Sequence, residues 1–404
     1  MSRAFAVVAP MFRPRRDGVQ AVVFPAPVLA RLWRRAAARE AGMLAALDLR
    51  DERDRAHVDL VCGRLLTAAA AVARDEADLI WPAGPALGAD RDEDLAELAR
   101  CCDLAPMIHR RLDNLPSWTG RPDEEALAQL RLLVRDCADL SPDGVRRLLD
   151  ILIAHMDGAA QILRVVVHAF QAAQRDAVLA QSDLAVFAER LLTAAEARVD
   201  RNRRFSSQAP DLAEALVLRD DLAWVGDTLA EMERTLALSV DGEWAGRVRA
   251  ARRALGQVLG DRLVDAPRAV ERVLPTVRVQ TAGRMTRVAP SLETVVTPDA
   301  WRGAEAAIEV LRGSRGPATA FGCEAKRRQI SEALIQRLAE YADQALDAVN
   351  GGETPDEWGA LDRIEVLASL LVRLDAAEEA RTVRRRAAVA GVMGRGDAAS
   401  RPAA

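Results

Sequence analysis

The sequence has 404 residues, enough for two or three domains or for one extended array of repeated helices. Half of the residues are hydrophobic, but only 4% are aromatic, and much of the apolar content is alanine. Alanine is the strongest helix former, so this composition predicts an all-α fold, either a multi-helix bundle or an array of helical hairpins. The formal net charge of −4 excludes a global electrostatic attraction to nucleic acid or to an anionic membrane.

The cysteines and the apolar segments bear on the compartment. Five scattered cysteines do not form the disulfide framework of a small secreted domain, so they favour a reducing compartment. Residues 4–12 are apolar and follow Arg3, as in a signal peptide, but three arginines come next and no small-residue cleavage site follows. No apolar run reaches the ~18–20 residues that span a bilayer. We therefore expect a cytoplasmic protein without a membrane span.

The N-terminal region, residues 1–120, is predicted to begin with strands. Residues 6–8 and 19–24 are rich in valine and lie on either side of a plausible turn. Short apolar runs of this kind around a turn predict a β-hairpin near residues 3–24.

Helices are predicted from near Val28 onward. Apolar residues then recur every three or four positions, which places them on one face of a helix. They are Val58, Val61, Leu65, Ala69 and Val72. A further helix begins near Asp92 and is expected to end by Pro106, because proline has no backbone N–H and its ring clashes with the preceding turn. The N-terminal region is thus expected to combine short strands with helices.

The central region, residues 121–296, is predicted to be helical and to end in a second β-hairpin. Its apolar residues keep a spacing of three and four over residues 215–236, which is typical of a helix that packs nearly antiparallel to a neighbour. Residues 277–281 alternate apolar and polar side chains before Ala-Gly, which predicts a hairpin over residues 276–288. Outward arginines make this hairpin a candidate contact surface, although the plainer interpretation is a small hairpin that covers a helix end.

The C-terminal region, residues 297–390, is predicted to form helical hairpins, followed by a disordered tail at residues 391–404. Several helix starts are marked by Ser or Thr before Pro-Asp. Such a side chain accepts a hydrogen bond from an otherwise unpaired backbone N–H, and proline fits the first helical position. This pattern predicts N-caps at Ser141, Thr297 and Thr354.

The tryptophans raise the question of a helical repeat. Trp244, Trp301 and Trp358 lie 57 residues apart, and the last two share a Thr-Pro-Asp-X-Trp context. Stacked helical hairpins, each burying its apolar face on the next, would explain this spacing. The alternative is an irregular multi-helix bundle, because Pro-Asp helix starts are common for capping reasons alone.

Residue types that carry catalysis are scarce, with four histidines, one tyrosine and one lysine. His57 and His109 each have a carboxylate within about one helical turn, but neither set reaches the three or four converging ligands that zinc requires. The adjacent Cys101 and Cys102 do not form a C-x-x-C motif and are expected to be buried as small hydrophobes. The sequence therefore offers no catalytic residue, no metal ligand set and no cofactor motif.

Residues 313–328 form the most unusual segment, a glycine-containing loop that leads into a helix start with three consecutive cations. Helix N-termini bind anions, and nearby cations reinforce that binding. The candidate anion-binding residues are Gly322, Cys323, Lys326, Arg327 and Arg328. Their spacing does not match the phosphate-binding G-x-x-x-x-G-K-[ST] motif, and we favour an inter-helix loop with a solvated basic turn.

These features favour a non-catalytic scaffold or regulator that acts through protein–protein interaction. Long amphipathic helices stack into surfaces that suit partner helices or peptides. One alternative is a nucleic-acid-associated regulator that uses the arginine clusters at residues 201–204, 247–253 and 384–386. The other is an all-helical enzyme whose site is assembled from distant carboxylates and arginines, which sequence periodicity does not detect.

Overall fold

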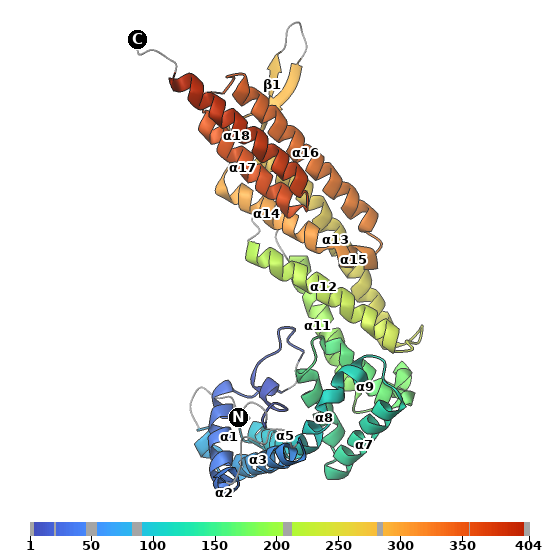
Figure 1. Ribbon diagram of the computed structural model, residues 1–404. Coiled ribbons are helices and arrows are strands. Elements are labelled where there is room, and N and C mark those ends of the chain that lie inside the picture. The colour runs from blue at the N-terminus through green and yellow to red at the C-terminus, as the bar shows by residue number, and fades with distance from the viewer. Residues whose placement is uncertain are drawn as a thin grey trace. The chain divides into compact units, whose positions relative to one another are not determined.

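The computed structural model describes residues 4–19, 22–45, 55–82, 91–204, 212–280, 286–354 and 356–399. Within these ranges the chain forms 18 α-helices, a few short 3-10 helices and one two-stranded antiparallel sheet. The all-α prediction is therefore confirmed (Figure 1).

The chain divides into two compact units. Unit 1 comprises Met1–Ala194 and Ala230–Gly246, and unit 2 comprises Ala195–Leu229 and Arg247–Ala404. The three divisions fall inside the long helices α11 (Ala185–Arg204), α12 (Leu212–Thr235) and α13 (Glu243–Val273).

Unit 1 is built from short and medium-length helices. These are η1 (Ala9–Phe12), α1 (Ala26–Arg39), α2 (Ala41–Ala45), α3 (Arg55–Asp75), α4 (Ala77–Ile80), α5 (Arg91–His109), η2 (Leu112–Asn114), α6 (Leu115–Thr119), α7 (Glu124–Leu140), α8 (Gly144–Ala154), η3 (Ala159–Gln161), α9 (Ile162–Ala169), η4 (Gln171–Gln174) and α10 (Asp176–Leu179). Helices α3 and α5 lie side by side and pack extensively against each other (Figure 1). Small buried side chains such as Ala69 and Ala105 line these helices and allow a close approach.

Pro106 does not end its helix, so that prediction is wrong. Helix α5 continues through Pro106 to His109. A Cβ atom on Gly63 of α3 would lie 3.8 Å from the Cβ atom of Pro106, so the proline ring packs on a gap in the facing helix. Burial of Ile108 beyond the proline offsets the one helical hydrogen bond that proline removes.

The N-terminal hairpin is also a wrong prediction. The described part of residues 4–24 forms turns and η1 and contains no strand. Val7, Val8, Met11 and Phe12 are all buried, whereas a half-exposed strand would turn every second side chain to solvent. A continuous apolar run is better buried by a tightly turning chain, and the backbone bonds locally, as from Val8 N to the oxygen of Phe5 at 3.1 Å.

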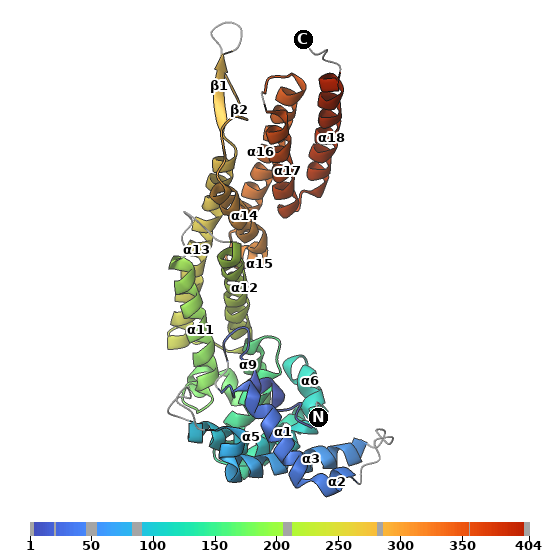
Figure 2. The same ribbon diagram turned by 90° about the vertical axis from the view of Figure 1, so that its left-hand side faces the viewer.

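Unit 2 contains the longer helices and the hairpin. Besides the parts of α11, α12 and α13, it holds β1 (Thr276–Gln280), β2 (Thr286–Pro290), α14 (Pro298–Gly313), α15 (Arg315–Ala320), α16 (Glu324–Asn350), α17 (Glu357–Arg373) and α18 (Ala377–Ala399). Helices α16, α17 and α18 each pack against the other two, and Figure 2 shows them side by side. The predicted hairpin over residues 276–288 is confirmed by the pairing of β1 with β2.

The predicted N-caps had different outcomes. Thr297 caps α14 through a hydrogen bond from Ala300 N at 3.3 Å, as predicted. Helix α17 is capped instead by Asp356, which accepts from Gly359 N at 2.9 Å. Helix α8 begins after Asp143 without a side-chain cap, and the hydroxyl of Ser141, the predicted cap, instead accepts from Arg147 at 3.0 Å.

The three evenly spaced tryptophans each lie in the first turns of a helix, α13, α14 and α17. Trp244 is buried, whereas Trp358 is 62% exposed, so the surroundings differ. The elements that follow also differ, since α15 separates α14 from α16 and no such helix separates α17 from α18. The repeat stays a prediction.

Helix α18 continues to Ala399, past the point where the disordered tail was expected to begin, and residues 400–404 lie outside the described ranges.

A buried carboxylate fixes the turn between α12 and α13 in unit 1. Asp176 accepts hydrogen bonds from Ser239 N at 2.8 Å, from Ser239 Oγ at 2.5 Å and from Ala177 N at 2.7 Å. The Ala237 amide beside it donates to the carbonyl of Gln174 at 2.8 Å. Burial alone would raise the pKa of Asp176, but these hydrogen bonds hold the pKa below its ordinary value.

We predict that Gly144→Ala destabilises the protein. A Cβ atom at this position would lie 1.8 Å from the carbonyl oxygen of Cys137, so the start of α8 must move away from the end of α7. Overpacking of this kind costs about 1–3 kcal/mol, measured as the free energy of unfolding in urea. Gly256→Ala in α13 is the matched control, since a Cβ atom there meets nothing within 4 Å, and it should stabilise by ~0.5–1 kcal/mol.

We predict that Asp176→Asn destabilises the protein by about 1–3 kcal/mol at pH 7, because the new amide NH₂ group must face either the Ser239 N–H or the Ala177 N–H. The folded pKa is lowered, so the ionised carboxylate stabilises the fold above the unfolded pKa of about 4. That contribution is lost as the pH falls through the folded pKa. Urea unfolding at pH 7 and pH 3 should therefore show a smaller difference between wild type and variant at pH 3, and an equal difference would contradict the assignment.

Candidate functional site

The base of the β1–β2 hairpin is anchored to the helices of unit 2. The Tyr341 hydroxyl of α16 donates to the carbonyl of Pro275 at 2.9 Å, and Ser291 N donates to the same oxygen at 2.8 Å. Arg363 of α17 donates to the carbonyls of Ser291 at 2.8 Å and Thr294 at 2.6 Å. Both ends of the hairpin are therefore held where the strands leave the helices.

The hairpin leaves the outer edge of β1 open. The only strand that pairs with β1 within the described ranges is β2, in register Val277–Ala289 and Val279–Arg287. Because Ser291 N bonds to Pro275, these two pairs are the hydrogen-bonded ones of the antiparallel ladder. The main-chain N–H and C=O of Arg278, which lies between them, consequently point away from β2.

A groove of about 520 Å³ lies between one face of the hairpin and the C-terminal part of α16. Its apolar surface is provided by Val277, Val279 and Ala289 of the hairpin and by Ala348 of α16. Val277 is 39% exposed and Val279 is 40% exposed, which is high for valine side chains in a strand. The groove therefore presents apolar surface to solvent on one face of the hairpin, where α16 packs against β2.

The charged groups that line the groove are mainly acidic. They are the carboxylates of Glu293, Asp347 and Glu353 and the guanidinium of Arg287. Asp347 pairs with Arg386 at 3.2 Å, whereas the exposed Glu293 and Glu353 form no ion pair with a described residue. The groove thus favours a ligand with positive charge.

The candidate anion-binding residues lie at the start of α16, but their charged groups are directed to separate partners. Arg327 bonds twice to Glu324 at 2.7 Å, and Arg328 lies 3.7 Å from Glu332. Lys326 reaches the carbonyl of Gly260 at 3.4 Å. Gly322 N and Cys323 N donate to the carbonyls of Thr319 and Ala318. The anion site stays a prediction.

Many arginines of the three clusters pair with carboxylates. Arg201 bonds to Asp221, Arg247 to Glu196 and Arg384 to Glu365. Arg252 instead lies over the ring of Phe321 at 5.3 Å. These contacts use much of the positive charge that the clusters would offer to phosphates.

The histidines and cysteines are dispersed. His155 Nε2 lies 2.7 Å from the carbonyl of Val7, and burial lowers the pKa of His155. Cys101 and Cys102 are buried as expected, and burial raises the pKa of Cys102 to about 12. Within the described ranges no group of three or more His, Cys, Asp or Glu side chains is placed to hold a metal ion.

The sequence pattern predicts the hairpin but does not predict the residues that anchor it and line its groove. Tyr341 and Arg363 are separated from the hairpin by two or more helices, and periodicity does not report such contacts. The signal that was present is that Tyr341, the sole tyrosine, lies on the buried stripe of α16. A buried tyrosine hydroxyl requires a hydrogen-bond partner.

Comparisons of the chain with protein-family models, with curated proteins and with solved structures find no match. Among the described residues, no helix is both long enough and apolar enough to cross a membrane.

We predict that Tyr341 ionises only above the range of a free tyrosine. Burial raises the pKa of Tyr341, and the nearby guanidinium of Arg363 opposes this only in part. Because the chain has one tyrosine, tyrosinate absorbance reports on this group alone. The folded protein should develop the signal above pH 10, whereas the urea-unfolded control should titrate near pH 10. Coincident titrations would show that the anchor is not formed.

Proposed function

We propose that this protein is a non-catalytic helical scaffold or regulator that acts in the cytoplasm by binding a segment of a protein partner. The partner segment is extended and basic, and it adds a strand along the outer edge of β1. The observation that carries the proposal is that β1 is an edge strand of a hairpin, and that this hairpin lines a groove whose charged groups are mainly acidic.

The main-chain geometry supports strand addition. A two-stranded hairpin is marginally stable by itself, and each open edge offers unpaired N–H and C=O groups. The anchors at Tyr341 and Arg363 hold the base of the hairpin in place. A partner strand would therefore meet a prepared edge, and its main chain would supply affinity without a large rearrangement.

The side chains along the groove support a basic partner. Glu293 and Glu353 have exposed carboxylates, and the valines of β1 present apolar surface between the charged groups. A segment with a basic and an apolar side chain two residues apart would satisfy both features, since side chains two residues apart in a strand point to the same face. The arginine pairs described above leave the nucleic-acid alternative with less support.

We predict that Arg278→Pro abolishes partner binding while Arg278→Ala preserves most of it. The Arg278 N–H points outward, so proline removes a donor to the added strand without breaking the β1–β2 ladder. Tagged wild type and both variants would be used to capture partners from an extract of the source organism, with and without nuclease. Circular dichroism would establish that all three proteins fold.

A protein that is captured after nuclease treatment by wild type and Arg278→Ala, but not by Arg278→Pro, would support the proposal. Capture of the same proteins by all three would exclude β1 as the docking edge. Partners that disappear with nuclease would favour the nucleic-acid alternative, and their affinity should then fall steeply with salt.

A further inference from the structure

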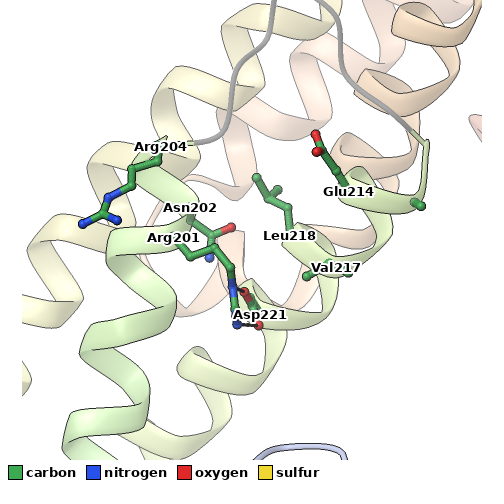
Figure 3. A pocket seen from close by; sticks show the side chains of 8 residues that line it. Arg201, Asn202, Arg204, Glu214, Val217, Leu218 and Asp221 are labelled. Carbon is green, nitrogen blue, oxygen red and sulfur yellow. Dashed lines mark hydrogen bonds and ion pairs between the residues drawn. The ribbon is translucent and has the colours of Figure 1, made fainter.

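A second cavity in unit 2, independent of the hairpin groove, lies between the C-terminal end of α11 and the N-terminal half of α12 (Figure 3). Its volume is about 480 Å³. Val217 and Leu218 of α12 provide an apolar wall, and Arg201 and Asn202 of α11 lie opposite. Val217 is 51% exposed, so the wall is open to solvent at this side chain.

The carboxylate at the floor of the cavity is matched by two guanidinium groups. Asp221 is buried, and it accepts hydrogen bonds from Arg201 at 2.7 and 2.9 Å, which Figure 3 shows as dashed lines. Arg198 approaches the same carboxylate at 3.3 Å and stacks on Trp224. The cluster therefore carries no unmatched negative charge and serves to hold α11 against α12.

Asn202 carries an unmatched hydrogen-bond acceptor. The residue is 1% exposed, and its Nδ2 donates to the carbonyl of Arg198 at 2.8 Å. Only the NH₂ end of the amide can donate to that carbonyl, so the orientation of the amide is fixed. Its Oδ1 is buried without a hydrogen-bond partner, and in Figure 3 this oxygen points into the space between the two helices. Such a group destabilises the fold until a donor reaches it.

The remaining charges at the mouth are Glu214 and Arg204. Both side chains are exposed, and neither forms an ion pair with a described residue. In Figure 3 the Arg204 guanidinium extends away from α12, whereas the Glu214 carboxylate lies at the rim of the cavity. The site thus combines a buried acceptor beneath the cavity, a carboxylate at the rim and an apolar wall.

We propose that this cavity binds a small organic amine in its protonated form. The ammonium group donates a hydrogen bond to Asn202 Oδ1 and is attracted by Glu214, and the apolar body of the ligand packs on Val217 and Leu218. Leu218 is buried and lies beside the amide oxygen in Figure 3, so the ligand reaches Oδ1 by displacing this side chain. An acid of the same shape is excluded, because it would bring a lone pair to Oδ1 and a negative charge to Glu214.

The test uses 2-phenylethylamine as the probe, with phenylacetate as the anionic compound of similar shape and 2-phenylethanol as the neutral one. Binding would be followed through the amide NMR signals of residues 198–204 and 213–221 in the full chain. We expect saturable shifts with the amine, weaker ones with the alcohol and none with the acid. Equal binding of amine and acid, or no saturable shift with the amine, would overturn the proposal.

Two variants locate the contacts. Asn202→Leu removes the acceptor and should weaken amine binding by about tenfold or more. Glu214→Gln, on the surface, should weaken it about two- to fivefold and reduce its salt dependence. Asp227→Asn, an exposed change on α12 outside the cavity, should leave affinity unchanged. If Asn202→Leu fails to fold, Glu214→Gln decides, and unchanged affinity in that variant would contradict the assigned site.

Discussion

Buried carboxylates met by arginines from other helices are the interaction on which much of this fold depends. Five acidic residues are buried within the described ranges, and four of them are bound by a guanidinium. The pairs are Asp150 with Arg190, Asp221 with Arg201, Glu231 with Arg164 and Glu309 with Arg219. Removing one partner of such a pair leaves an uncompensated buried charge, so each pair specifies which helix faces may meet. Alanine-rich surfaces alone are too uniform to supply that specificity.

This use of arginine explains why clusters of basic residues in the sequence are weak indicators of function here. Arg164 forms a double hydrogen bond with Glu231 at 2.5 and 2.6 Å and also donates to the carbonyl of Thr119. Lysine, with a single ammonium group, does not reproduce this planar geometry. The near absence of lysine from the chain is therefore compatible with a structural role for guanidinium groups, beside any bias of the genome.

Local patterns in the sequence predict the helices and the hairpin at residues 276–288. They do not predict contacts between residues that are far apart in the sequence. The stripe from Ala215 to Leu236 is buried along its length, as its spacing predicts, because helical periodicity is a local property. The sequence wrongly predicts strands at the N-terminal valines, because a short apolar run does not distinguish a strand from a buried turn. Asn202 gave no signal, since an asparagine near a helix end is ordinarily a surface residue. The divisions between the units fall inside helices, where composition does not change.

The two proposed sites share a physical origin. The buried carboxylates of this fold accept hydrogen bonds from nearby donors. A main-chain or side-chain polar group that has no hydrogen-bond partner therefore indicates a place where a ligand can bind. At β1 the unmatched groups are the outward N–H and C=O of the strand, and at Asn202 the unmatched group is one amide oxygen. The first set extends along a line and suits another main chain, whereas the second is a single acceptor at the floor of a cavity and suits a compact donor. Both sites lie in unit 2, where the tyrosine and arginine anchors and the Asp221 pair hold the surrounding backbone in place.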